Sequence, residues 1–262
     1  MAESYPAYED RPRRRWGRRL LVTAIVLLVV LGGLLVVADR VAANFAERKV
    51  ADQVRQEVAK QQLQSSPPQV TVGGFPFLTQ VVDGRYESIG IVLRDLHGEV
   101  SGNSVRLPRL DVDARDVTAS LDTLRSGQGD VTARNVDGKA TISYDSVAEL
   151  IEQPGVKLGE KNGKLTVTAP LQILGQQFTV NGTADLTVKD GRVQVRFSDL
   201  AADGLPQVPA AQALVSAYAQ QISIAVPLPK LPFRLDLREV RATPDGLSVT
   251  ATAKDVPINA VA

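Results

Sequence analysis

Few side chains in this sequence are of the types that catalyse reactions or bind metal ions. The chain contains no cysteine and one histidine, His97, which lies in a predicted turn before Gly98-Glu99. Without cysteine, neither disulfide bonds nor thiolate metal sites can form. A single histidine in a turn is more often a surface residue than a catalytic base or a metal ligand. Because the sequence also lacks a nucleophile elbow, a phosphate-binding loop and a His-Glu-x-x-His pattern, we predict neither a metal nor a cofactor.

The strongest candidate for catalysis is a pair of acidic residues, Asp111 and Asp113, which flank Val112. The pair resembles the Asp-x-Asp motif through which many glycosyltransferases bind a metal–nucleotide complex. In an alternating strand, however, both carboxylates project from the polar face, away from Leu110 and Val112. A solvated strand face explains them better, because no nucleotide-binding pattern surrounds them. We therefore predict that the protein is not an enzyme and keep an envelope glycan enzyme as an alternative.

A second unusual segment is apolar. Residues 73–78 read Gly-Gly-Phe-Pro-Phe-Leu, and an apolar strand with a tight turn at Asp83-Gly84 is predicted to follow. Phe75, Phe77 and Leu78 could cap an ordinary core. They could instead surround the opening of an apolar cavity, with the glycines and the proline shaping the backbone.

Composition and charge limit the class of protein. The chain has 262 residues, 44% of them hydrophobic, which is enough for a folded domain with a sizeable core. Aromatic residues make up only 5%, so any apolar surface is mostly aliphatic. The first 19 residues carry six arginines and three acidic residues, and the remainder carries 24 basic and 26 acidic residues. Because the body is slightly acidic, we predict no nucleic-acid partner.

The N-terminus has the pattern of a membrane anchor. Residues 1–19 form a basic tail, and residues 20–38 carry no charge and a single polar side chain, Thr23. At about 1.5 Å per residue, a helix of this length just spans a hydrocarbon core of about 30 Å. Positive charge stays on the cytoplasmic side, so we predict a single-pass protein of the cytoplasmic membrane with its N-terminus inside and its folded domain extracytoplasmic. The alternative is a cleavable signal sequence, although its apolar region is typically about 7–15 residues.

Residues 39–68 are predicted to form an amphipathic helix and a linker. The helix continues from the membrane segment and ends at Ser65-Ser66-Pro67-Pro68. Apolar residues recur on one face at helical spacing: Phe45, Ala46, Val50, Val54 and Val58.

Residues 69–262 are predicted to form one β-rich domain. Apolar and polar residues alternate in runs at 89–93, 110–114, 165–169, 178–180, 184–188, 193–197, 235–240 and 247–251. Each run is typical of a half-buried antiparallel strand. Seven Asp-Gly or Asn-Gly pairs, at 83–84, 137–138, 162–163, 181–182, 190–191, 203–204 and 245–246, favour tight hairpin turns. Runs 184–188 and 193–197 form the clearest hairpin.

We predict an α+β fold in which a long, strongly curved antiparallel sheet wraps one or two amphipathic helices. At Pro108-Arg109 the apolar positions change from odd to even numbers, which indicates an extra residue that bends the strand. A second amphipathic helix is predicted to start near Pro209 and to have Val226 at its far end, and a short one is predicted at Ser146–Glu152.

Two segments resemble a known protein family. Residues 74–81 (Gly-Phe-Pro-Phe-Leu-Thr-Gln-Val) and 84–89 (Gly-Arg-Tyr-Glu-Ser-Ile) resemble the actinobacterial LmeA-like family, which is described as phospholipid-binding. Residues 240–252 are similar to the closing hairpin of that family. The resemblance implies an extracytoplasmic protein with a lipid-holding cavity, similar to the tubular lipid-binding folds. It also implies a role in envelope lipid or lipoglycan assembly, with envelope glycan-assembly enzymes as candidate partners.

Together, the residues and the resemblance predict a phospholipid held in an apolar cavity. The predicted lipid-binding residues are Phe75, Phe77, Leu78, Val81, Ile89, Ile91, Leu93, Leu214, Tyr218 and Ile222. The alternative is a non-catalytic envelope scaffold. A lipid carrier needs a continuous apolar cavity of several hundred Å³, roughly, whereas a scaffold would have a densely packed interior.

Overall fold

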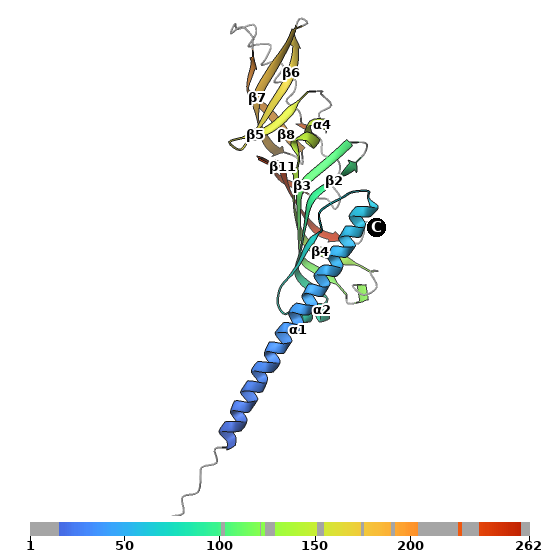
Figure 1. Cartoon of the computed structure of the whole chain (residues 1–262), viewed down its shortest axis with the longest axis vertical. Coiled ribbons are helices and arrows are strands. Elements are labelled where there is room, and N and C mark those ends of the chain that lie inside the picture. The colour runs from blue at the N-terminus through green and yellow to red at the C-terminus, as the bar shows by residue number, and fades with distance from the viewer. Residues whose placement is uncertain are drawn as a thin grey trace, which may run out of the picture.

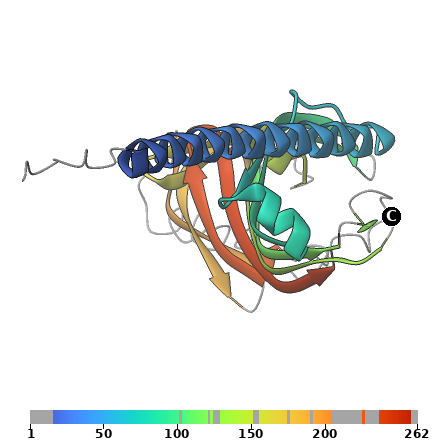
Figure 2. The same cartoon turned by 90° about the horizontal axis from the view of Figure 1, so that it is seen from below.

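A computed structural model describes residues 16–100, 103–120, 122–123, 129–150, 155–173, 176–189, 192–203, 225–226 and 236–257. In this part of the chain, two antiparallel sheets lie at one end of a long helix that projects away from them (Figure 1). Seen from below, strands curve around one side and the long helix runs across the other (Figure 2). The predicted helix with Leu214, Tyr218 and Ile222 lies outside the described residues. Val226, predicted at its far end, lies instead in a short strand, β9 (Ala225–Val226).

The long helix, α1, runs unbroken from Trp16 to Lys60. The large hydrophobic side chains of its apolar segment, residues 20–38, are exposed, and this helix is long and apolar enough to cross a membrane. Beyond Ala38 the same helix continues along the domain, as the sequence predicts. The predicted packing face is correct at Ala46, which packs against the core, and at the half-buried Val50, Val54 and Val58. It is wrong at Phe45, which is 63% exposed, and Ala43 is buried instead.

The larger sheet has six strands in the order β1–β2–β3–β4–β11–β10. These strands are β1 (Gln69–Gly73), β2 (Arg85–Val100), β3 (Asn103–Ala119), β4 (Val131–Ile142), β10 (Asp236–Thr243) and β11 (Gly246–Pro257). The smaller sheet has five strands in the order β5–β6–β7–β8–β9. They are β5 (Lys157–Lys161), β6 (Lys164–Ile173), β7 (Gln176–Lys189), β8 (Arg192–Asp203) and β9 (Ala225–Val226). The α+β class, the antiparallel pairing and the β7–β8 hairpin are confirmed. The strands of the described residues divide between two sheets instead of forming the one predicted sheet.

The two sheets meet along β10 and β11. Ala242 and Leu247 pack against Leu165 and Ala184 of the smaller sheet. Helix α4 (Tyr144–Leu150), near the predicted short helix, lies at this seam. The hydroxyl of Tyr144 donates a hydrogen bond to the Thr243 carbonyl oxygen at 2.7 Å, and burial raises the pKa of this phenol.

The Asp-Gly and Asn-Gly pairs mark turns only in part. Asn162-Gly163 joins β5 to β6, and Asp245-Gly246 joins β10 to β11. The turns predicted at Asp137-Gly138 and Asn181-Gly182 are wrong, because these pairs lie inside β4 and β7. Asp83-Gly84 ends a helix instead of a strand. Such pairs tolerate a positive φ but do not require one.

That helix is α2 (Phe77–Asp83), where the sequence predicts a strand. Gly84 adopts a left-handed conformation with φ of 64° and ends the helix, as glycine commonly does. At the other end, the backbone N–H of Leu78 donates to the carboxylate of Asp39 at 2.8 Å. This hydrogen bond joins α2 to α1.

Kinks that neighbouring strands share keep one face of the larger sheet apolar. Asp95, Asp116 and Asp255 lie in strands with φ of 52°, 51° and 50°, a conformation that aspartate tolerates better than most residues. On β2 and β3, Tyr86 pairs with Val117 and Ser88 pairs with Arg115, so the residues between them drop out of the ladder together.

The phase slip predicted at Pro108-Arg109 has the same cause. Arg94 pairs with Arg109 and Leu96 with Leu107, so Asp95 and Pro108 leave the ladder as a pair. The extra residue is therefore present in both strands, and the register does not shift as it would at a one-sided bulge.

Candidate functional site

The inner face of the larger sheet, which we define as the face that packs against α1 and α2 at one end, is almost entirely aliphatic. The strand register arranges its side chains in four rows across β2, β3, β4 and β11. The rows are Leu93–Leu110–Ala140–Val249, Ile91–Val112–Gly138–Ala251, Ile89–Ala114–Val136–Ala253 and Tyr86–Val117–Ala133–Val256. Because β4 contributes mainly alanine and glycine, the side chains are shortest in the middle of the face.

The end of this face beside α2 is a filled core. Phe77 and Tyr86 are buried, and their ring centroids lie 6.4 Å apart. They pack with Ala43 of α1 and with Val117 and Ala133 of the sheet. The hydroxyl of Tyr86 is buried without a hydrogen-bond partner in the described part of the chain, and burial raises its pKa. The sheet and both helices therefore close the inner face at this end.

The structure separates the predicted lipid-binding residues at and next to α2 into two groups. Phe77 belongs to the core, and Val81 and Ile89 pack against it. Phe75 and Leu78, in contrast, are 55% and 41% exposed. The Phe-Pro-Phe-Leu segment thus supplies both a core plug and an exposed apolar surface.

Two more predicted residues that the structure describes lie farther along β2. Leu93 is buried and Ile91 is half-buried, and both belong to the rows of the inner face. Along β2, the inner face is therefore less covered at Ile91 than at Tyr86 and Leu93, which lie on either side of it.

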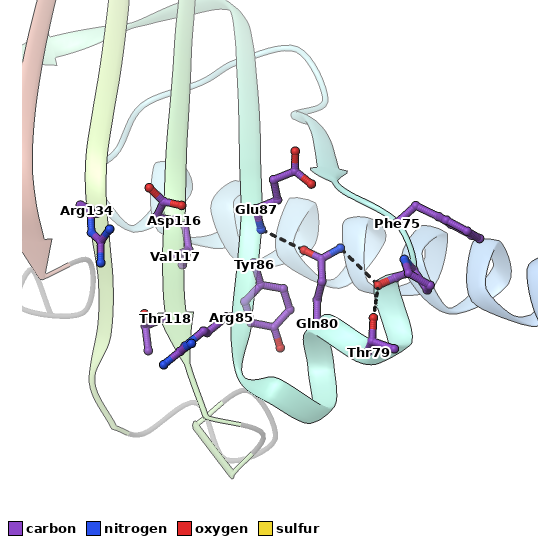
Figure 3. A pocket seen from close by; sticks show the side chains of 11 residues that line it. Phe75, Thr79, Gln80, Arg85, Tyr86, Glu87, Asp116, Val117, Thr118 and Arg134 are labelled. Carbon is purple, nitrogen blue, oxygen red and sulfur yellow. Dashed lines mark hydrogen bonds between the residues drawn. The ribbon is translucent and has the colours of Figure 1, made fainter.

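An open pocket of about 600 Å³ lies between α2 and the shared kink of β2, β3 and β4 (Figure 3). Its lining residues are Phe75, Pro76, Thr79, Gln80, Arg85, Tyr86, Glu87, Asp116, Val117, Thr118 and Arg134. The Gln80 side chain accepts a hydrogen bond from the Glu87 backbone N–H at 2.9 Å and donates one to the Gly73 carbonyl oxygen at 3.2 Å. These bonds fix α2 against β2, so the shape of the pocket is built into the fold.

The charged residues of this pocket were missed by the sequence analysis. Arg85, Glu87, Asp116 and Arg134 come from three strands, and each one alone looks like part of a solvated strand face. Only the shared kink brings them to one place. The pocket therefore combines a few apolar side chains, such as Phe75 and Val117, with two cationic and two anionic side chains.

Comparison with known proteins identifies the family. A family model described as LmeA-like phospholipid-binding matches residues 37–252. The chain belongs to this family. No curated protein and no solved structure gives a match. The LmeA-like region begins where the apolar segment of α1 ends and includes the pocket and most of the inner face. The family is described by the lipid it binds rather than by a reaction.

The candidate catalytic groups of this LmeA-like chain lie elsewhere. Asp111 accepts two hydrogen bonds from the Arg109 guanidinium, both at 2.7 Å, and Asp113 accepts one from Arg115 at 2.7 Å. His97 lies within β2 instead of the predicted turn, and its Nδ1 is 2.7 Å from the Asp95 carbonyl oxygen. Among the described residues, no group of three or more His, Asp or Glu side chains is placed to hold a metal ion.

Proposed function

We propose that this protein is a membrane-anchored, extracytoplasmic lipid carrier that holds the acyl chains of a phospholipid against the inner face of the larger sheet. The observation that carries the proposal is the exposure of the middle of that face. Ile91, Val112 and Gly138, three of the four residues of one row, are half-buried, and only Ala251 at its end is buried, in a chain of a phospholipid-binding family. Acyl chains are bound by apolar walls of this kind.

The pocket beside α2 suits a polar headgroup better than acyl chains. Arg85 and Arg134 supply guanidinium groups, which bind phosphate oxygens with paired hydrogen bonds. Tyr86 and Val117 line the pocket and also belong to the fourth row of the inner face. We propose that the headgroup lies in this pocket, next to the end of the apolar rows.

The cellular role follows from the anchor. Six arginines precede the apolar segment, which supports an N-terminus inside and a domain outside the cytoplasmic membrane. A lipid carrier in that compartment would deliver phospholipid for the assembly of lipids or lipoglycans in the cell envelope. Its partners would be glycan-assembly enzymes.

An envelope scaffold is the second candidate, because the end of the inner face beside α2 is already filled by Phe77, Tyr86 and Val117. The two functions differ in what covers the middle of the face. A carrier leaves it to a lipid, whereas a scaffold has no ligand there.

Two glycines on opposite faces of the sheet give a matched test. Gly138 lies in the inner row of Val112, and a Cβ there would come no closer than 3.9 Å to another atom, the Ala251 carbonyl oxygen. Gly90 lies opposite Asp113 on the other face, where the nearest atom would also be 3.9 Å away. Gly138→Leu and Gly90→Leu should therefore both fold, but only the first adds bulk to the inner face.

We expect full-length Gly138→Leu to retain less phospholipid than wild type and Gly90→Leu to retain the same amount. The measurement is native mass spectrometry with lipid extraction after exhaustive detergent exchange. Lipid bound around the apolar segment of α1 is common to all three proteins and cancels in the comparison. Equal lipid content in both variants and wild type would favour the scaffold.

A further inference from the structure

The exposed large hydrophobic side chains of the folded domain are gathered at one end. Beyond Ala38, the exposed large hydrophobic residues in the described part of the chain are Val41, Phe45, Phe75, Leu78 and Val82. All of them lie on α1 just after the apolar segment, on α2, or directly before α2. The strands from Arg85 to Pro257 contribute none among the residues described. We call these five residues the apolar end patch.

Two contacts place this patch at the level where the apolar segment ends. Asp39, the first residue after that segment, accepts the hydrogen bond from the Leu78 backbone N–H at 2.8 Å. The guanidinium of Arg40, the next residue, lies 5.1 Å from the centroid of the Phe75 ring. Asp39 is only 2% exposed, so the junction between α1 and α2 is packed. In Figure 1, α2 lies at the end of the domain from which the apolar segment projects.

The continuity of α1 fixes the distance between the patch and the bilayer. At about 1.5 Å per residue, Val41 lies about 4.5 Å and Phe45 about 10 Å beyond Ala38 along the helix axis. Side chains on a helix lean towards its N-terminus, here towards the membrane. The headgroup region adds about 5–7 Å to each side of the hydrocarbon core. With no break in the helix between residues 16 and 60, the domain has no linker on which to move away.

The pattern of the patch also matches a membrane surface. Val41 and Phe45 are four residues apart on α1, and Leu78 and Val82 are four apart on α2, so each pair shares one helix face. Two aromatic rings are each paired with a cation, Phe75 with Arg40 and Phe45 with Lys49 at 5.8 Å. Aromatic rings with neighbouring basic groups are typical of the headgroup region, where the ring lies in apolar surroundings and the cation meets phosphate.

We propose that the apolar end patch inserts into the headgroup region of the same bilayer that α1 crosses, and so holds the domain directly on the membrane. The partner is a phospholipid surface, and α2 is its principal contact. This inference does not depend on which lipid, if any, the inner face holds. It also gives a role to the exposed apolar side chains of α2, Val82 at 82% and Leu78 at 41%, which would otherwise face water.

Tryptophan fluorescence can test this docking in the full-length chain. The chain has one tryptophan, Trp16, which is replaced by phenylalanine to give a silent background. Val82→Trp reports on the patch, because Val82 is exposed and is not part of the pocket wall. Lys164→Trp, in the smaller sheet, is the control, since the Lys164 side chain is also exposed, at 50%. Both are reconstituted in vesicles of phosphatidylcholine and phosphatidylglycerol, with and without bromine near the headgroup end of the acyl chains.

We expect the Val82→Trp emission to shift to the blue and to lose intensity in brominated vesicles, while the Lys164→Trp emission does neither. Adding Gly138→Leu to the Val82→Trp chain should leave this quenching unchanged, which separates docking from lipid held on the inner face. Quenching of Val82→Trp no stronger than that of Lys164→Trp would overturn the proposal. Quenching that disappears with Gly138→Leu would also overturn it, because the quencher would then be a lipid carried by the domain.

Discussion

The two faces of the larger sheet are made by the same strands but have opposite chemistry. On the inner face, Ile91, Val112 and Gly138 lie side by side in one row. In the next row, on the outer face, Asp111 pairs with Lys139. The outer face also carries ion pairs, including those of Arg109 with Asp111, Arg115 with Asp113 and Asp137, and Arg241 with Glu239.

This difference shows that the inner face must stay aliphatic, whereas the outer face can carry charged residues. The shared kinks at Asp95, Asp116 and Asp255 move the alternation by one residue in neighbouring strands together, so the aliphatic face stays on one side along the whole length. The outer ion pairs are exposed and contribute little to stability. Changes on the inner face should therefore affect both folding and binding, whereas changes at these outer ion pairs, which lie away from the pocket, should affect neither.

The largest difference between the faces is expected at Val117 and Thr118, which are neighbours on β3. Val117 is 1% exposed in the inner core, and Thr118 is exposed on the other side. Burying an unpaired carboxylate costs several kcal/mol, roughly, against a total stability of about 5–15 kcal/mol, so Val117→Asp should unfold or severely destabilise the domain. Thr118→Asp should change the free energy of unfolding by about 0.5 kcal/mol or less.

Thermal unfolding of the full-length chain in detergent micelles, followed by circular dichroism, measures both variants against wild type. Val117→Ala, which removes two methyl groups, gives an intermediate point with a loss of about 2 kcal/mol. Similar melting temperatures for Val117→Asp and Thr118→Asp would mean that the two faces are not distinguished in the way the structure shows.

A smaller effect is expected at Asp39, which helps to close the inner face beside α2. Asp39→Ala removes the acceptor for the Leu78 backbone N–H. A hydrogen bond to a carboxylate contributes about 1.5 kcal/mol, and losing it should make α2 exchange its amide hydrogens roughly tenfold faster. Asp39→Asn keeps an oxygen acceptor and should behave more like wild type. Amide hydrogen exchange in residues 77–83, with β4 as the internal reference, measures the difference. Unchanged exchange in α2 of Asp39→Ala would show that other contacts hold this helix.

Most of the architecture can be predicted from local sequence, and the exceptions have identifiable causes. Alternation reveals strands such as β3 and β8, and the apolar segment of α1 is evident from its length. Strand β4 escapes prediction because its inner residues, such as Ala133 and Gly138, are too small to give a strong apolar period. Helix α2 escapes because seven residues, with Phe77 and Val81 four apart, do not distinguish a helix from a strand.

The site was predictable only in part. The Phe-Pro-Phe-Leu segment stood out, but the local sequence does not reveal that Phe77 is buried while Phe75 is exposed, since this depends on how α2 meets α1 through Asp39. The charged pocket depends on kinks that align residues from separate strands, such as Glu87 and Arg134, and no local pattern encodes that alignment. Leu214, Tyr218 and Ile222 remain predictions.

The smallest effect is expected at Asp111, on the outer face. Its carboxylate is held by Arg109, but both side chains are partly exposed, at 30% and 51%, so solvent screens the pair. Asp111→Asn should change the free energy of unfolding by about 0.5 kcal/mol or less, and added salt should reduce even that difference. The lipid content of the purified protein should be unchanged, because the side chain is on the face opposite Val112. Asp113→Asn should behave in the same way.

If either variant abolished the cellular activity of the protein while its stability and lipid content stayed at wild-type values, the outer face would carry chemistry of its own. An envelope glycan enzyme would then replace the lipid carrier as the leading function.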